Sequence, residues 1–193
     1  MADRVYCYPD SDVLVNKLGI REKEKLSVFE KKLTMLRLLE IVDNPMEGEF
    51  DFAHLKAIHR YIFQDLYEWA GMVRTVDIAK GNMFCSVRFL EAQAEEIFGK
   101  LRKDRFLEGL ERGNFVKKIA YYFAEINALH PFREGNGRSQ REFIRCLALK
   151  NGYVINFSEV PEKMMLQASQ ESFLCEYRTM EEVFARCVHR RRE

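Results

Sequence analysis

The sequence predicts an all-α helical bundle that carries one small β-hairpin. Apolar residues recur every three or four positions through most of the 193 residues, which is the spacing of one face of a helix. Only residues 72–87 alternate apolar and polar side chains with period two, the pattern of a strand. Hydrophobic residues make up 47% of the chain, enough for a full core, so residues 1–193 are expected to form a single domain.

The first helix is expected at residues 22–42, after a turn-rich N-terminal stretch. Its apolar residues lie at helical spacing with charged residues between them, so we expect an amphipathic helix. The charged residues at 22–25 and 30–32 are interpreted as a solvent-exposed face.

The second helix is expected at residues 51–67, with Asp51 as its N-terminal cap. His54 and His59 are five residues apart, or about 140° around a helix, so they cannot hold one metal from one face. We interpret both as surface or hydrogen-bonded structural histidines.

The hairpin comes next, at residues 72–87, with Lys80-Gly81-Asn82 as its turn. A lone two-stranded hairpin is not stable by itself, so it must lie against helices. It is the only strong strand signal that we find in the chain.

Three further helical regions are expected. One such region covers residues 90–110. The helix that leads to His130 follows it, and Asn114 is expected to be the N-terminal cap of that helix. A third region follows a short apolar passage and extends over residues 158–188, where a methionine-rich stripe indicates core or a partner surface.

The most informative stretch is residues 130–141, which read HPFREGNGRSQR. Apolar spacing before it places His130 at a helix end, and Pro131 cannot continue that helix. The Gly-Asn-Gly run allows a sharp turn, and the helix that follows this turn is expected to begin near Arg138.

This stretch has the features of an anion site. Unpaired amides and the helix dipole add at a helix N-terminus, where phosphates bind. Arg138, Arg141 and Arg145 fall within roughly 60° of one another on the expected helix, so arginines converge there with the amides. A carboxylate, Glu134, and a histidine, His130, stand beside them. The residues therefore predict a phosphate site with a metal ligand and a base.

Composition excludes several other classes. The net charge is +1, which indicates no direct nucleic-acid footprint. No apolar run is long enough to span a membrane, and the N-terminus lacks a signal-peptide core. The five cysteines are scattered without a C-x-x-C pair and are interpreted as reduced thiols, so a cytoplasmic location is expected.

Residues 130–141 match the motif of the Fic family, His-Pro-Phe-x-(Asp/Glu)-Gly-Asn-Gly-Arg-x-x-Arg, at every specified position. Eight fixed positions and one two-way choice make this match highly specific. The chain therefore resembles a Fic domain, with a core at about 8–188, the motif at 130–141 and a flap at about 73–87. Other segments also look like those of the family: residues 8–9, 16–20, 55–59, 67–71 and 80–81.

The resemblance implies a protein adenylyltransferase, which transfers AMP from ATP to a Ser, Thr or Tyr hydroxyl of a target protein, with Mg²⁺. His130 is the expected general base, since imidazole titrates near neutral pH, and Glu134 the expected Mg²⁺ ligand. The expected nucleotide-binding residues come from the motif and the flap: Gly135, Asn136, Gly137, Arg138, Arg141, Lys80 and Gly81.

The hairpin has two interpretations, a structural flap or, as the resemblance favours, a flap that docks the target by strand addition.

Reactions other than AMP transfer also stay open. Family members resembling Doc transfer phosphate and have Lys where this chain has Gly137, so the sequence favours AMP. Transfer of UMP or phosphocholine is a further alternative, as is a catalytically silent nucleotide-binding module.

Many Fic enzymes are held inactive by a helix with the pattern (Ser/Thr)-x-x-x-Glu-(Gly/Asn), whose glutamate pairs with the second motif arginine. Two stretches come close, but Lys163 and Tyr177 stand where the pattern needs Gly or Asn. We therefore expect an antitoxin-like protein to supply the glutamate, docked near the first helix, as in two-protein bacterial toxin modules. Self-inhibition through Glu176 is the rival.

Overall fold

Seven helices and two small antiparallel sheets form the part of the protein that the computed structural model describes, residues 5–80 and 82–191. The predicted, mostly helical bundle is thereby confirmed. No helix in these residues is long and apolar enough to cross a membrane. The helices are α1 (Lys23–Asp43), α2 (Phe52–Phe63), α3 (Leu90–Lys103), α4 (Arg112–Leu129), α5 (Asn136–Lys150), α6 (Glu162–Ser172) and α7 (Arg178–Cys187).

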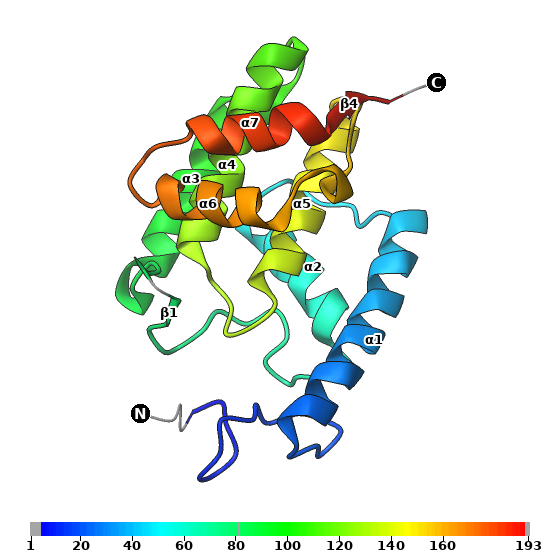
Figure 1. Cartoon of the computed structure of the whole chain (residues 1–193), viewed down its shortest axis with the longest axis vertical. Helices are drawn as coiled ribbons and strands as arrows, with labels where there is room; N and C mark the ends of the chain where they lie inside the picture. Colours follow the sequence, from blue (N-terminus) through cyan, green and yellow to red (C-terminus); the bar gives the residue numbers. More distant parts are fainter. Residues whose placement is uncertain (1–4, 81, 192–193) are drawn as a thin grey trace.

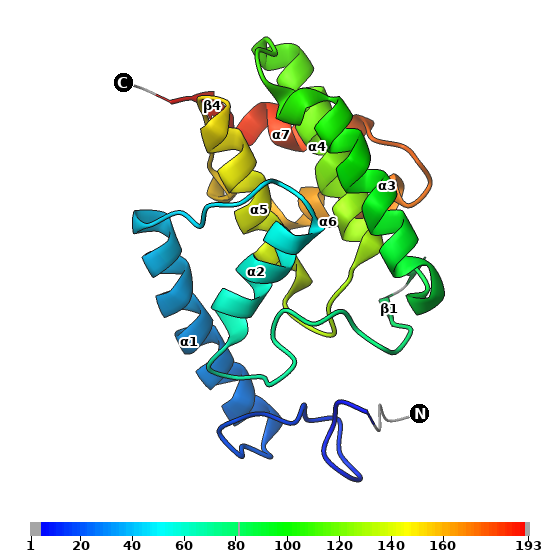
Figure 2. The ribbon, with the colours of Figure 1, turned by 180° about the vertical axis from the view of Figure 1, so that it is seen from behind.

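Helix α5 lies in the middle of the bundle (Figures 1 and 2), where it packs against α2 and α4. Helix α4 in turn packs against α3 and α7, whereas α1 reaches the bundle through α2. Large aromatic side chains from α2, α4, α5 and α7 are buried at the centre. Among those with 0% exposure are Phe63, Phe115, Tyr122, Phe143 and Phe184.

Helix α1 differs from the amphipathic helix that the sequence predicted. One side packs on the bundle through Leu26 and Ile41. The rest of its circumference also carries large apolar side chains, and these are exposed. They are Val28, Phe29, Met35, Leu36, Leu39 and Val42. These exposed residues form a second apolar face of α1, and an exposed apolar patch of this kind often marks an interaction surface.

Helix α2 begins where predicted, and the Asp51 carboxylate accepts a hydrogen bond from the His54 amide at 2.8 Å, so the predicted cap is confirmed. The helix ends at Phe63, earlier than predicted. His54 and His59 are both buried, so the surface alternative is wrong for each. Burial lowers the pKa of His54, whose Nε2 lies 3.2 Å from the Met46 carbonyl.

Two helix boundaries beside the bundle core also differ from prediction. Helix α3 stops at Lys103 because the next residues, the 3-10 turn Arg105–Leu107, have a left-handed backbone, with φ of 52° at Phe106. Helix α4 begins at Arg112 after a Glu111 that makes no side-chain cap, so Asn114 is not the cap. Both differences arise from local backbone geometry that apolar spacing does not encode.

The C-terminal region contains a break and a sheet that the sequence did not predict. Helices α6 and α7 are separate, with Cys175 left-handed at φ 61° between them. Strand β4 (Val188–Arg190) pairs antiparallel with β3 (Tyr153–Ile155), which follows α5. Strands of three residues are too short to give a recognisable alternation.

The flap hairpin is present but much shorter than predicted. Strand β1 (Ala79–Lys80) pairs antiparallel with β2 (Asn82–Met83), two residues each. Gly81 at the turn lies outside the described residues, and of Lys80 only the backbone is described. The alternating stretch before β1 forms no strand because its amides bond elsewhere: the Arg74 amide donates to the Pro131 carbonyl at 2.9 Å.

Candidate functional site

The loop between α4 and α5 is tightly constrained. His130 ends α4 in a left-handed conformation (φ 46°, ψ 60°), and α5 begins at Asn136, two residues before the predicted start. Gly135 has φ 81°, and a Cβ atom there would lie 2.1 Å from the ring of Phe63. Only glycine can occupy this position without moving α2 or the loop.

The side chain of Asn136 closes the loop. Its Oδ1 accepts from the Phe132 amide at 2.8 Å, and its Nδ2 donates to the Phe132 carbonyl at 2.7 Å. Asn136 and Gly137 are the first two residues of α5, where amides have no acceptor inside the helix. The loop therefore places the amide end of α5 where the sequence analysis expects an anion, so the anion site stays a prediction.

His59 of α2 contacts the loop through a hydrogen bond and a ring stack. Its Nδ1 accepts from the Gly71 amide at 2.8 Å, so its Nε2 carries the proton and donates to the Glu134 carbonyl at 2.9 Å. The ring stacks on Phe132 at 3.8 Å between centroids. Burial lowers the pKa of His59 to about 4, so the ring is neutral at pH 7.

The three arginines of α5 have different surroundings. Arg138 Nη2 lies 2.5 Å from the carboxylate of Glu30, on α1. Arg145 makes a two-pronged pair with Glu142, at 2.7 and 2.8 Å, and so does not join the other two at the anion site. Glu30, which the sequence analysis interpreted as a surface charge, instead lies at the site.

Arg141 is the arginine without a counter-charge. No carboxylate of residues 5–80 or 82–191 lies within 4.0 Å of its guanidinium nitrogens. The guanidinium lies 5.8 Å from the centre of the Phe157 ring, and a Cβ at Gly137 would be 3.8 Å from its Nη1. Desolvation lowers the pKa of Arg141. A solvent-accessible cation beside free amides is ready to bind an anion.

Glu134 stands at the mouth of this site with a side chain that is 47% exposed. Its Oε1 accepts from the Gly135 amide at 2.8 Å and lies 3.6 Å from Arg138 Nη2. No group of three or more His, Cys, Asp or Glu side chains in the described part could hold a metal by itself. A metal at Glu134 would therefore need further oxygen ligands from a bound phosphate.

The base of the flap is attached to the His130 end of α4. Arg74, which is 1% exposed, donates to the His130 carbonyl at 2.9 Å and also to the carbonyls of Val76 and Cys85. The Phe84 ring, just after β2, stacks on the His130 imidazole at 3.7 Å with an interplanar angle of 15°. The flap and the His130 side chain are therefore held in a fixed position relative to each other.

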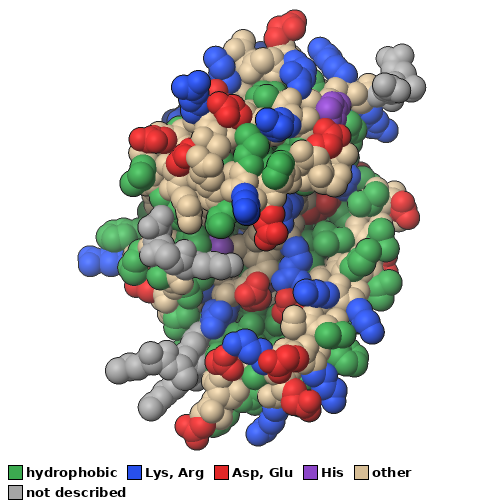
Figure 3. Space-filling model, viewed as in Figure 1, with side chains coloured by type: hydrophobic (Ala, Val, Ile, Leu, Met, Phe, Trp, Pro, Cys, Tyr) green, Lys and Arg blue, Asp and Glu red, His purple; other side chains and the backbone are tan. Residues whose placement is uncertain are grey.

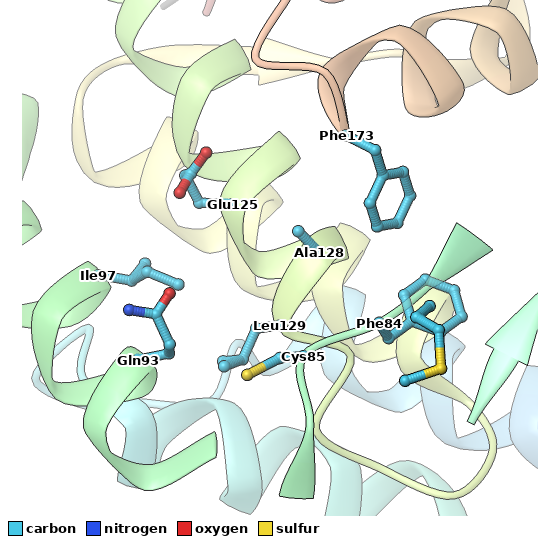
Figure 4. A pocket seen from close by; sticks show the side chains of 9 residues that line it. Phe84, Cys85, Gln93, Ile97, Glu125, Ala128, Leu129 and Phe173 are labelled. Atoms are coloured by element: carbon cyan, nitrogen blue, oxygen red, sulfur yellow. The ribbon is translucent and has the colours of Figure 1, made fainter. Parts of the chain in front are cut away.

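Two hollows flank the flap and His130. On the face seen in Figure 3, the surface is hollowed between α1 and α6, and acidic and basic side chains gather there. The other is a pocket of about 240 Å³ between the flap, α3 and α4 (Figure 4). Its lining combines apolar side chains, among them Phe84, Ile97 and Phe173, with the polar Gln93 and Glu125.

Several residues of this arrangement were not identified from the sequence. They come from segments far from the motif, and no local pattern marks them. Only membership of the segments that resemble the Fic family, such as residues 55–59 and 67–71, could have drawn attention to two of them. The residues are Glu30, Thr34, His59, Tyr67, Arg74 and Phe84.

The fold and the site define a helical protein in which a histidine and two arginines lie near the N-terminus of α5. The chain belongs to the Fic/DOC family, whose sequence profile matches residues 49–148. The family expected from the motif is thereby confirmed.

Similar proteins come from several bacteria. Over 169 residues the chain is 41% identical to protein adenylyltransferase VbhT of Bartonella schoenbuchensis, covering 87% of this chain and 35% of that protein. Over 184 residues it is 34% identical to the Escherichia coli Fic protein, named a probable protein adenylyltransferase, covering 95% and 91%.

Among solved structures, the N-terminal Fic domain of a VirB-translocated Bep effector protein from Bartonella quintana, with bound ADP, has a TM-score of 0.94. It is 28% identical in sequence, and the likeness covers 100% of this chain and 98% of that one. The chain thus spans about a third of VbhT but nearly all of the other two.

Proposed function

We propose that this protein transfers AMP from ATP to a hydroxyl side chain of another protein. The observation that carries the proposal is the pairing of Arg141, which has no carboxylate partner in the described residues, with the free amide end of α5. The names of the relatives and the ADP of the B. quintana domain support the same reaction.

The phosphates would lie on the amides of Asn136 and Gly137, with Arg141 and Arg138 on the outer phosphate groups. The Gly135 amide donates to Glu134 Oε1 and would have to leave that carboxylate to bind phosphate. A planar guanidinium can donate two parallel hydrogen bonds to phosphate oxygens. Both arginines are on α5, one turn apart, so they can reach adjacent phosphates. Lys80 and Gly81, of which the structure describes only the Lys80 backbone, are further proposed nucleotide-binding residues.

Glu134 is the proposed ligand of Mg²⁺, and its surroundings fit. Mg²⁺ in nucleotide sites usually binds one or two carboxylates and completes its shell with phosphate oxygens and water. The Glu134 carboxylate is half exposed at the edge of the anion site, and one of its oxygens is committed to the Gly135 amide. When bound, the metal would offset phosphate charge.

His130 is proposed as the general base. The target hydroxyl oxygen forms a bond to the α-phosphorus, the bond from that phosphorus to its bridging oxygen breaks, and pyrophosphate leaves. The proton of the hydroxyl moves to the His130 imidazole. The left-handed backbone, the Phe84 ring and the Arg74 bond to its carbonyl together fix where this imidazole lies.

The target is proposed to dock along the flap. Strand β2 has an outer edge, and an extended segment can add to such an edge by main-chain hydrogen bonds. Because Phe84 directly follows β2 and stacks on His130, a segment on the flap would place a side chain beside the base.

ATP labelled either on the α- or on the γ-phosphorus tests the reaction. The purified chain is incubated with each label, Mg²⁺ and a bacterial lysate, and protein-bound label is followed by mass spectrometry. AMP transfer requires protein label from α-labelled ATP only. Label from the γ-position alone would instead identify phosphate transfer, and ATP binding without protein label would identify a silent module. UTP and CDP-choline as alternative donors test UMP and phosphocholine transfer.

We further propose that an antitoxin-like protein controls the chain in trans. Among the described residues no carboxylate neutralises Arg141, so an inhibitory glutamate would have to come from elsewhere. The exposed apolar side chains Val28, Met35 and Leu39 on the outward side of α1 offer a surface on which a helix of such a protein could pack.

A further inference from the structure

A carboxylate from outside the motif reaches into the anion site. The Glu30 side chain, on α1, is only 15% exposed. One of its oxygens lies 2.5 Å from Arg138 Nη2, and the other accepts a hydrogen bond from the Tyr67 hydroxyl. Burial and the charge of Glu30 raise the pKa of Tyr67, so its hydroxyl remains a donor. Glu30 is thus fixed at both oxygens.

The guanidinium of Arg138 is held from several sides. Its Nη1 donates to Thr34 Oγ1 at 3.1 Å, and Thr34 in turn donates to the Glu30 carbonyl at 2.7 Å. Its carbon lies 4.6 Å from the centre of the Phe63 ring, which limits movement away from α5. Of the five N–H groups of an arginine, these contacts use two. The remaining donors have no hydrogen-bond partner in the part of the chain that the structure describes, although Glu134 Oε1 lies 3.6 Å from Nη2, so they can bind a ligand.

We propose that Glu30 is a positioning residue that aims Arg138 at the phosphates of a bound nucleotide. It acts through Arg138 and does not itself touch the ligand. Fixing a flexible arginine before binding removes part of the entropy loss that binding would otherwise carry. The inference rests on the proposed function, because it assumes that the anion site takes phosphates.

The negative charge of Glu30 lowers the affinity of the site for phosphate, whereas its positioning of Arg138 raises that affinity. A carboxylate near an anion site repels phosphate, so removing its charge alone would strengthen binding. This repulsion does not depend on Arg138, whereas positioning does. The two contributions can therefore be separated by measuring the effect of Glu30 with and without Arg138.

The experiment is a double-mutant cycle of Glu30→Gln and Arg138→Ala in the full chain, with ADP and Mg²⁺ as the probe and calorimetry as the measurement. We expect Glu30→Gln to weaken ADP binding about tenfold when Arg138 is present. In the Arg138→Ala background the same change should leave binding unaltered or strengthen it.

Glu40→Gln is the matched control. Glu40 lies on the same helix and accepts from an arginine and a tyrosine, Arg37 and Tyr61, neither of which belongs to the motif. Its replacement should leave ADP affinity unchanged, and thermal unfolding of all variants shows which remain folded.

Three outcomes would overturn the inference or its premise. Unchanged or tighter ADP binding by Glu30→Gln in the presence of Arg138 would exclude positioning. Equal losses in both backgrounds would show a general structural role instead. If the unsubstituted chain does not bind ADP, the proposed function fails before the role of Glu30 is reached.

Discussion

Arg138 and Arg141 lie one turn apart on α5, but only Arg138 has a carboxylate partner in the described residues. Arg141 can therefore be removed without leaving a buried charge behind. We expect Arg141→Ala to reduce the affinity for ATP by about 2 kcal/mol, the loss typical of a charged hydrogen bond. The free energy of unfolding should change by less than about 0.5 kcal/mol.

Calorimetry with ATP and Mg²⁺, together with thermal unfolding, checks both halves of this expectation. Arg102→Ala, on the exposed side of α3, removes the same charge away from the site and serves as the control. Unchanged ATP affinity in Arg141→Ala would mean that the anion site does not use this arginine.

His130→Ala should separate chemistry from binding. The imidazole is the proposed base, whereas the proposed anion site is built from α5, so ATP should still bind. The labelling rate should fall by roughly 10²–10⁴-fold, which is the usual effect of losing a general base. The rate of protein labelling and the ATP affinity are measured on the same preparation. A parallel loss of both would argue against the assignment.

The start of α5 depends on Gly135 more than on any other residue of the loop. A methyl group there meets the Phe63 ring, and φ of 81° is unfavourable for alanine. We expect Gly135→Ala to lower the free energy of unfolding by about 3 kcal/mol. Gly113→Ala is the control: in α4 nothing lies within 4 Å of its Cβ, so alanine should stabilise the helix by about 0.5–1 kcal/mol. Chemical denaturation of the two variants provides the comparison.

The elements that sequence spacing predicts well are those with long apolar periodicity. Helices α4 and α5 were found to within about three residues at their ends because each buries one broad stripe and because Pro131 and Gly135 separate them. The β3–β4 sheet was missed because three-residue strands carry too little pattern. The α1 helix was taken as amphipathic because its intervening charges mask apolar residues on every side.

For the site, too, the sequence predicts local groupings but not contacts between distant residues. Its motif residues are contiguous, so their spacing alone places amides, arginines, carboxylate and histidine together. Their partners come from elsewhere: Glu30 and Arg138 are separated by 108 positions, and Arg74 and His130 by 56. A single sequence does not reveal which distant residue meets which, since that depends on how the helices pack.

At the scale of the whole molecule, buried neutral His59 makes stability depend on pH. Its pKa is about 4 in the folded chain against an ordinary value of 6.5. Between these values the unfolded chain binds the extra proton, so stability is complete above pH 6.5 and falls as the pH is lowered towards 4. The loss from this residue alone is about 3 kcal/mol at pH 4.

Urea unfolding at a series of pH values measures this loss. His59→Gln keeps a neutral donor in the same place, so its unfolding free energy should be lower at pH 7 but less sensitive to pH between 6.5 and 4. An equally steep dependence in both proteins would assign the effect to other groups, such as buried His54.

Control by a separate protein can be tested on the same scale. If Arg141 is open in the chain alone, expression of the chain in a bacterium without its inhibitor should arrest growth, and the His130→Ala variant should not. Placing a charge on the outward side of α1, as in Met35→Lys or Leu39→Lys, should preserve the arrest but prevent rescue by the co-expressed inhibitor. A packed apolar face does not tolerate an unpaired charge.

The rival hypothesis is self-inhibition through Glu176, which is exposed between α6 and α7. A large rise in self-labelling by Glu176→Gly would contradict control in trans, whereas unchanged labelling would leave the separate inhibitor as the source of the glutamate.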